Sequence, residues 1–147
     1  MAGDRRPPCD ICRGEAFDAE FGRTLVWRDE LWRLATSVVA PIVGFSYLEP
    51  IRHISDISDL DGREAETFGP ALSRVTRLLK ALTGADIVYA LMFGDHIAHL
   101  HVNLVPHRAG DALTGGATLI DPAAPALPRD VHDTFVTRLR AAAGEVL

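Results

Sequence analysis

The chain has 147 residues, of which 48% are hydrophobic and 24% are charged, and its formal net charge is -5 at pH 7. A chain of this length buries roughly two-thirds of its unfolded surface, so no disulfide framework is required. The composition excludes a largely disordered chain, and the acidic balance argues against a surface that coats nucleic acid.

Membrane and export signals are missing from the sequence. No apolar stretch approaches the roughly 20 residues that cross a bilayer, and residues 1–8 contain no apolar signal segment. We therefore expect one cytoplasmic domain over residues 1–147, with a flexible N-terminus at residues 1–8 and with neither a membrane nor a nucleic-acid partner.

The first half of the chain predicts three strands and a long helix. Residues 24–27 and 31–36 are apolar runs separated by a polar break, which is typical of a hairpin, and residues 42–48 predict a third strand. Asp61 and Glu64 have the spacing of a helix-start capping box, and Gly84 is placed to end the helix. The helix between them has an apolar stripe of Phe68, Ala71, Leu72, Val75, Leu78, Leu79 and Leu82.

The second half predicts a hairpin, a loop and a closing helix. Residues 86–93 indicate a buried strand, and residues 98–106 indicate its antiparallel partner. Residues 108–128 are rich in Gly, Ala and Pro and predict a long loop. A helix from 128 or 129 to 143 follows, with Val131, Phe135, Leu139 and Ala142 facing inward. The sum is an α+β domain, with an antiparallel sheet and helices mainly on one face.

The strand at residues 98–106 alternates apolar and polar side chains. Ala98, Leu100, Val102 and Leu104 are expected to face the core. His99, His101 and Asn103 would then project together from the other face, about 7 Å apart. Two histidines on an exposed sheet face are often only solvated, so this pattern alone leaves a site and a bland surface both open.

Four ordered segments within residues 9–107 resemble the histidine triad superfamily. Its signature of alternating histidines is matched by His99-Leu100-His101-Val102-Asn103-Leu104-Val105-Pro106, with Asn in place of the third histidine. Residues 26–30 resemble its early strand and turn, and residues 44–54 resemble a strand that ends in Pro-x-x-His. Cys9-Asp10-Ile11-Cys12 matches the Cys-x-x-Cys found at the start of many members. The resemblance implies a sheet of about five strands with one long helix and a C-terminal helix.

The resemblance also implies nucleotidyl chemistry in a protein that is commonly a homodimer. Family members hydrolyse or transfer nucleoside monophosphates from phosphoanhydrides, phosphoramidates or sugar phosphates, through a nucleotidyl-histidine intermediate. His101 occupies the position of the attacking histidine, which must be neutral with one nitrogen free. Asn103 and His96 are expected to help on the phosphate side, although His96 could equally cap a turn.

Three further positions depart from the family pattern. Asn103 can hydrogen-bond but cannot become cationic, and the uridylyltransferase branch likewise carries an amide, Gln, there. Ser37 stands where members place an acid that accepts the ribose hydroxyls, and His107 replaces the usual Arg after Pro106. We expect Ser37, Asn103 and His107 to line the substrate site.

Cys9 and Cys12 have three chemical readings: a zinc site, a redox pair or idle thiols. The redox reading expects a preceding strand, and only eight residues precede Cys9. In zinc-bearing family members the remaining ligands are the Pro-x-x-His histidine and the first triad histidine, which correspond to His53 and His99. Such a Cys2His2 zinc would be structural, because no position is left open for water. The alternative is that His53 is an ordinary polar residue and His99 a phosphate contact.

The sequence leaves a second function open. A zinc-stabilised protein could bind a nucleotide or metabolite with little turnover, or its pocket could accept a non-nucleotide phosphate compound. Trp27 and Trp32 could stack on a base, but aromatic residues in a hairpin are more often part of the core. We expect His132, in the closing helix, to be solvated.

Overall fold

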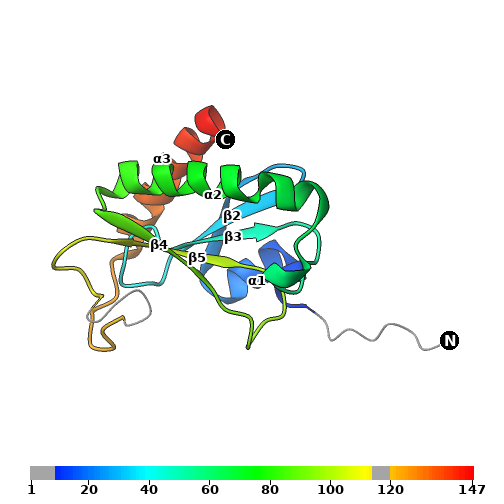
Figure 1. Cartoon of the computed structure of the whole chain (residues 1–147). Helices are drawn as coiled ribbons and strands as arrows, with labels where there is room; N and C mark the ends of the chain where they lie inside the picture. Colours follow the sequence, from blue (N-terminus) through cyan, green and yellow to red (C-terminus); the bar gives the residue numbers. More distant parts are fainter. Residues whose placement is uncertain (1–8, 114–119) are drawn as a thin grey trace.

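Five antiparallel strands form one sheet in the order β1-β2-β3-β5-β4 (Figure 1). The computed structural model describes residues 9–113 and 120–147, so the predicted flexible N-terminus and residues 114–119 of the predicted loop lie outside it. The strands are β1 (Arg23–Arg28), β2 (Trp32–Ser37), β3 (Ser46–Pro50), β4 (Ile87–Met92) and β5 (Val102–His107). The helices are α1 (Glu15–Glu20), α2 (Gly62–Thr83) and α3 (Arg129–Val146), with short 3-10 turns at Ile11–Arg13 and Ile57–Asp59. The predicted α+β architecture is confirmed.

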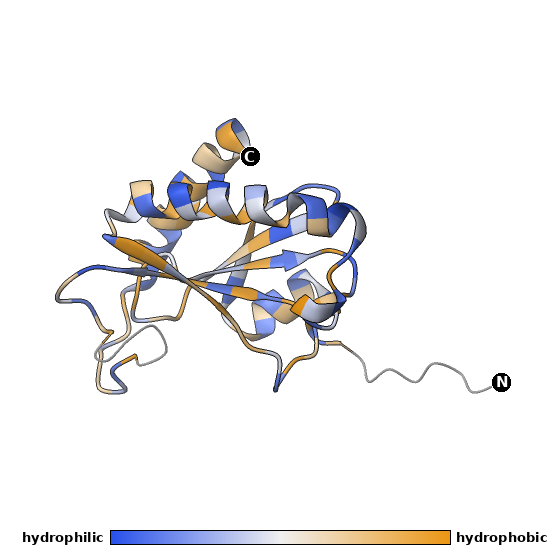
Figure 2. Cartoon of the chain, viewed as in Figure 1, coloured by the Kyte–Doolittle hydropathy of each residue, from blue (hydrophilic) through white to orange (hydrophobic). Residues whose placement is uncertain are grey.

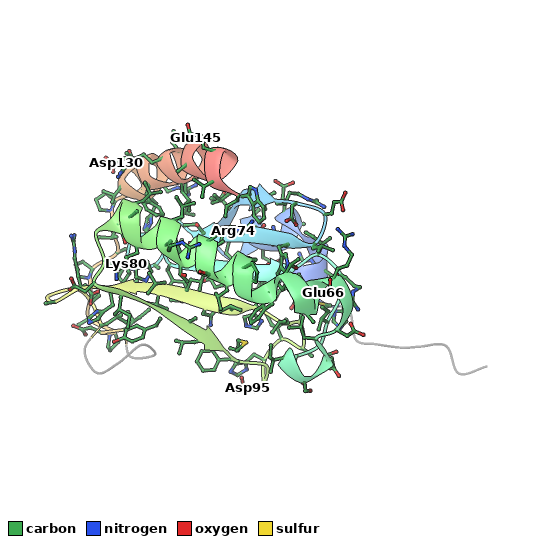
Figure 3. All side chains as sticks on the ribbon, turned by 45° about the horizontal axis from the view of Figure 1, so that its top comes forward. Glu66, Arg74, Lys80, Asp95, Asp130 and Glu145 are labelled. Carbon is green, nitrogen blue, oxygen red and sulfur yellow. The ribbon has the colours of Figure 1, made fainter. Side chains whose placement is uncertain are left out.

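The helices α2 and α3 cover one face of the sheet, and α1 lies on the other side (Figure 1). The core lies between the sheet and these two helices, where strand residues such as Leu34 and Leu104 pack with Leu79 and Leu139. Polar and apolar residues alternate along α2 (Figure 2), as its predicted stripe requires. Glu66, Arg74 and Lys80 mark the outer surface of this helix (Figure 3). None of the helices in the described ranges is long and apolar enough to cross a membrane.

The long helix begins and ends where the sequence predicts, but the predicted side-chain cap at its start is missing. Gly84 adopts the left-handed conformation, with φ 70°, and its amide closes the helix on the Lys80 carbonyl. The predicted capping box is wrong, because the Asp61 side chain makes no cap hydrogen bond. Arg52 binds both acids instead, at 2.7 Å from Asp61 and 3.1 Å from Glu64, so a cation has displaced the local cap.

The third strand begins at Ser46 rather than at residue 42. Residues 42–45 turn toward the helices, and Gly44 has φ 85°. A side chain at this position would meet Thr83 at 2.9 Å and Phe135 at 3.1 Å, so only glycine permits this approach. The apolar residues here belong to a loop that packs against α2 and α3. The hydrophobic pattern of the sequence alone could not distinguish this loop from a strand.

The predicted burial of strand 86–93 is wrong. Strand β4 is an edge strand, and Ile87 and Met92 are 46% and 45% exposed. A continuous apolar run indicates a strand but does not tell a central position from an uncovered edge. Trp32, by contrast, is in the core as expected, and its indole N–H donates to Thr67.

Strand β5 begins at Val102, later than predicted. Leu100, Val102 and Leu104 are buried as expected, but Ala98 is exposed because residues 98–101 precede the ladder. His99 is 1% exposed instead of lying on an open polar face with His101. The N-terminal segment covers His99. Burial by a segment so distant in the sequence cannot be predicted from the alternation of residues along one strand.

The closing helix ends at Val146, later than predicted, and the face that it buries differs slightly from the predicted one. Phe135 and Leu139 face the core, but Val131 is 38% exposed and Ala142 is only half-buried. His132 is 1% exposed, so the expectation that it is solvated is wrong. The buried face of α3 runs through His132, Val136 and Ala143 instead.

Candidate active site and metal centre

Four potential metal ligands from three separate segments meet in one cluster. Cys9 and Cys12 lie at the first turn, His53 follows β3, and His99 precedes β5; their donor atoms all lie within 4.8 Å of one another. The Nδ1 atom of His99 is 3.3 Å from the Cys9 sulfur and 3.4 Å from the Cys12 sulfur, and the His53 Nδ1 is 3.4 Å from Cys12. The predicted ligand set is therefore assembled by the fold.

The protonation of His99 suits a metal ligand. Its Nε2 atom lies 3.0 Å from the Pro50 carbonyl, which can only accept, so Nε2 carries the proton and Nδ1 is bare toward the sulfurs. Burial lowers the pKa of His99 to about 4, which keeps the ring neutral. Burial and the neighbouring Cys9 raise the pKa of Cys12 to about 11, so a cation is needed to stabilise two thiolates here.

The cluster fits tetrahedral zinc in both chemistry and size. Bonds of about 2.3 Å to sulfur and 2.0–2.1 Å to nitrogen set the edge between S and N in a tetrahedron at about 3.5 Å. Three of the four S···N separations are 3.3–3.4 Å and are close to this edge, and all donor atoms lie within 4.8 Å of one another. Both cysteines are free thiols, as zinc coordination requires.

His101 presents an unprotonated nitrogen for chemistry. Its Nδ1–H donates to the carbonyl of His99 at 2.6 Å, and a carbonyl cannot act as the donor. The other ring nitrogen, Nε2, must then be the bare one. The ring is part-buried, so it is held in place and can still be reached. One backbone contact thus fixes the tautomer that nucleophilic attack requires.

Asn103 lies in β5, two residues after His101. It pairs with Tyr47 of β3 and Leu91 of β4, and its Oδ1 atom is buried without a hydrogen-bond partner among the described residues. A buried polar atom without a partner is costly, so this oxygen marks a position where a bound hydrogen-bond donor would be stabilised, while the amide NH2 group of the same side chain can donate.

A buried ionic cluster supports the strands beside these residues, and the sequence reading missed it. Asp18 of α1 binds both Arg23 of β1 and Arg33 of β2, and Glu49 of β3 binds the same two arginines at 2.6 and 2.8 Å. All four side chains are at most 7% exposed. The signal was present, because Arg33 and Glu49 interrupt otherwise apolar strands and pair across β2 and β3.

Among the described residues, no hydrogen bond or ion pair joins the other three predicted site residues to His101. His96 is on the exposed turn before β5, with its side chain 93% exposed and 3.7 Å from Asp95, which marks that turn in Figure 3. The Ser37 hydroxyl is buried and accepts from the amides of Val39 and Ala40. His107 ends β5, roughly 20 Å from His101 at about 3.3 Å per residue. None of these contacts involves His101.

Solved structures of histidine triad proteins have a fold similar to that of this chain. No protein-family model and no curated protein matches the sequence. A histidine triad protein from Bradyrhizobium japonicum is 23% identical, with 84% of this chain and 92% of that chain covered and a TM-score of 0.73. A zinc-bound histidine triad family protein from Mycobacterium smegmatis is 20% identical over 95% and 97%, with a TM-score of 0.67.

A third, more distant structure is an enzyme. The diadenosine triphosphate hydrolase of Plasmodium falciparum, solved with cyclomarin A, is 11% identical over 82% of this chain and 76% of that chain, with a TM-score of 0.62. Likeness at these identities establishes the fold, and the chain has the histidine triad fold. The predicted resemblance is confirmed at that level.

Proposed function

We propose that this chain is a histidine triad nucleotide hydrolase or nucleotidyltransferase in which His101 is the nucleophile. The observation that carries the proposal is the 2.6 Å hydrogen bond from His101 Nδ1 to the His99 carbonyl, which leaves Nε2 bare. The diadenosine triphosphate hydrolase among the structural neighbours supports a phosphoanhydride substrate.

The proposed reaction has two displacements at phosphorus. The electron pair of His101 Nε2 forms a bond to the α-phosphorus while the bond to the leaving group's oxygen or nitrogen breaks, and the leaving group takes up a proton. Water or an acceptor hydroxyl then attacks the nucleotidyl-histidine, which releases the nucleotide and regenerates His101. Asn103 would donate to a phosphoryl oxygen through its amide, and the exposed His96 would supply the leaving group's proton.

We further propose that Cys9, Cys12, His53 and His99 hold a structural zinc ion. The zinc-bound structural neighbour and the four-donor cluster support this assignment. Bound there, zinc would neutralise the two thiolates and tie the N-terminal segment to both histidine-bearing segments. The carbonyl of His99 would then stand at a fixed position under the His101 ring.

The test is a panel of dinucleoside polyphosphates, nucleoside phosphoramidates and sugar nucleotides, incubated with wild type and with His101→Ala. Wild type is expected to consume at least one class and to carry labelled nucleotide on His101 after denaturation at alkaline pH, where a phosphorus–nitrogen bond survives. His101→Ala should lower the rate by more than about 10³-fold while zinc content and circular dichroism stay unchanged. Undiminished turnover by the variant would contradict the assignment of His101.

A binding protein with little turnover is the second candidate, and Asn103 favours it. The amide cannot supply the positive charge of a third histidine, which lowers the expected stabilisation of a pentacoordinate phosphorus. Under this alternative the same panel would show saturable binding without product, and His101→Ala would leave affinity nearly unchanged.

We also propose a homodimer formed through the edge strand β4. Ile87, Met92 and Phe93 are 45–48% exposed at the uncovered side of this strand, where unpaired backbone groups invite a second copy. Sedimentation of the purified chain as a monomer at micromolar concentration would contradict this.

A further inference from the structure

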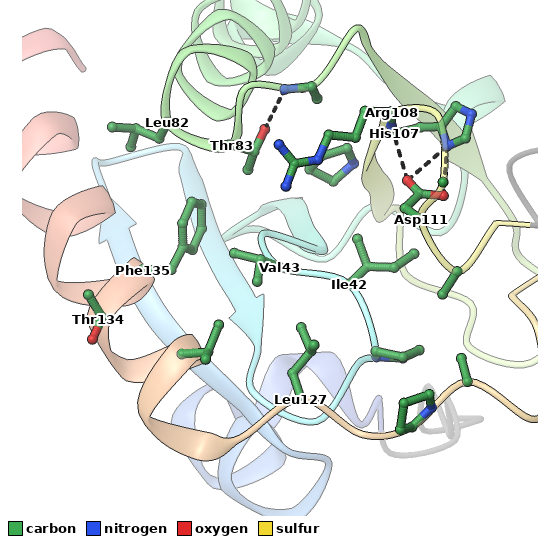
Figure 4. A pocket seen from close by; sticks show the side chains of 18 of the residues that line it. Ile42, Val43, Leu82, Thr83, His107, Arg108, Asp111, Leu127, Thr134 and Phe135 are labelled. Atoms are coloured by element: carbon green, nitrogen blue, oxygen red, sulfur yellow. Dashed lines mark hydrogen bonds and ion pairs between the residues drawn. The ribbon is translucent and has the colours of Figure 1, made fainter.

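A cavity of about 650 Å³ lies at the end of β5 that is remote from His101. Four segments form its walls: the turn after β2, the end of α2, the residues that follow β5 and the start of α3 (Figure 4). The volume lies within the 300–1,000 Å³ range of small-molecule sites. Neither His101 nor any member of the metal cluster lines it, so the cavity is separate from the proposed active site.

The floor and sides of the cavity are mainly apolar. Ile42 and Val43 come from the turn, Leu127 comes from the segment that leads into α3, and Val131 and Phe135 come from the start of α3. This wall is held by close packing, because Gly44 brings the turn against Thr83 and Phe135. A ligand with an apolar body would bury hydrocarbon surface here at about 25 cal/mol per Å².

Arginine supplies the uncommitted polar groups of the lining. The Arg108 side chain extends over the cavity toward Thr83 (Figure 4), and its Nη1 atom lies 3.8 Å from the position of a Cβ on Gly84. In residues 9–113 and 120–147, the guanidinium groups of Arg108 and Arg138 make neither a hydrogen bond nor an ion pair. Both therefore have donors available to an anion.

The acidic side chains that line the cavity limit how much negative charge a bound ligand can carry. Asp111 is committed, because its carboxylate accepts from the amides of Arg108 and Leu113 and lies 2.8 Å from His107 Nδ1. Burial raises the pKa of Asp111, but these hydrogen bonds outweigh it and leave the pKa below its usual value. With Asp130 also present, the charges of these two arginines and two carboxylates sum to zero, so the several negative charges of a polyphosphate would be offset much less well than a single carboxylate.

We propose that this cavity is a second binding site, for a small molecule with an apolar body and a single carboxylate. Arg108 would bind the carboxylate in a two-pronged ion pair, and the walls from the turn and α3 would take the hydrocarbon part. The site assigned here is independent of the nucleotidyl chemistry proposed for His101, and it stands or falls separately.

The test uses octanoate as the probe, titrated into the full chain and followed by nuclear magnetic resonance. Saturable shifts are expected around the cavity, with 1-octanol binding more weakly because it lacks the charge. Arg108→Met should weaken octanoate about tenfold or more, as expected for a charge-assisted hydrogen bond, and should leave 1-octanol unchanged. Arg77→Met, an exposed arginine on α2, is the matched control and should change neither.

A second variant keeps the test decisive if Arg108→Met alters the fold. Val131→Trp, at a 38% exposed position on the cavity wall, should fill the space and abolish binding of both probes. Lack of saturable octanoate shifts in folded wild type would overturn the proposal. Binding that survives both Arg108→Met and Val131→Trp would overturn it as well.

Discussion

The histidines at the two ends of strand β5 have different kinds of hydrogen-bond partner. At the start, the rings of His99 and His101 each donate one N–H to a backbone carbonyl and keep a bare nitrogen. At the far end, the His107 ring pairs with Asp111 and stacks on Tyr89, and Arg108 is left uncommitted. One end offers electron pairs to a metal or to phosphorus, and the other offers cationic donors to an anion.

The difference follows from the partner of each imidazole. A carbonyl has no proton to give, so it fixes which nitrogen is protonated and leaves the other as a base or ligand. A carboxylate that also accepts two backbone amides, as Asp111 does, serves to hold a turn. The same residue type at intervals along one strand thus has different chemistry because of what the backbone places beside it.

Removal of the metal cluster beside the start of β5 is expected to have the largest effect. Cys12→Ser should lower zinc content to near zero and destabilise the chain by more than about 5 kcal/mol, because a structural zinc site contributes its binding energy to folding. That loss corresponds to roughly 15 °C or more in melting temperature. Metal analysis and thermal unfolding measure both.

The control for this prediction is at the other end of the strand. His107→Ala should leave zinc content unchanged and lower the melting temperature far less, because His107 does not belong to the cluster. A metal-free wild type whose stability is not raised by added zinc would contradict the zinc assignment and leave the thiols without a role.

Breaking the buried ionic cluster is the next largest perturbation. Glu49 precedes Pro50, whose carbonyl holds His99, and it neutralises both Arg23 and Arg33. Glu49→Gln leaves two buried guanidinium groups facing one carboxylate, and this should cost about 3–5 kcal/mol. Urea unfolding of the zinc-loaded protein measures the loss.

An exposed ion pair on α3 gives the matched comparison. Asp133→Asn removes the partner of Arg129 at a site where both side chains are more than half exposed. Solvent-exposed pairs of this spacing contribute about 0.3–0.5 kcal/mol. Equal effects of the two substitutions would show that the buried cluster is not what fixes the strands beside His101.

The sequence predicted the site better than it predicted the surroundings. The resemblance to the histidine triad family named the four members of the metal cluster, which the fold brings together, and His101, because the family's signature is a local sequence pattern. Ala98 and His99 were misjudged, because the first depends on where a ladder begins and the second on a cover supplied from about 90 residues away. The capping box failed for a similar reason, since Arg52 competes for both of its acids.

The cavity, and the way in which the ionic cluster is paired, could not be predicted from the sequence, even though Arg33 and Glu49 stand out as charged residues within their strands. Each is built from side chains on segments far apart in the chain, such as Val43 and Phe135, or Asp18 and Glu49. No periodicity links such residues, so only the fold brings them together. His132 belongs to the same class, because its burial depends on how α3 is turned against the sheet.

We also expect a zinc-independent acid sensitivity at the far end of β5, where α3 forms the cavity wall, and this effect should be smaller than the loss caused by Glu49→Gln. Burial lowers the pKa of His132, and the nearby Ala40 carbonyl offsets only part of this; neither ring nitrogen has a full hydrogen bond within the described residues. The unfolded chain therefore binds a proton more readily than the folded one. Stability is fully present above pH 6.5 and falls below it, by up to about 1.4 kcal/mol per pH unit.

His132→Phe isolates this contribution, because it keeps an aromatic ring in the buried position without a titrating group. The stability difference between wild type and His132→Phe, both zinc-loaded, should be constant from pH 8 to 7. It should then shift in favour of the variant as the pH falls toward 5. Acid-induced loss at the metal cluster is common to both proteins and cancels in the difference. A difference that does not change with pH would mean that His132 takes up its proton in the folded state, and that α3 opens at this point without cost.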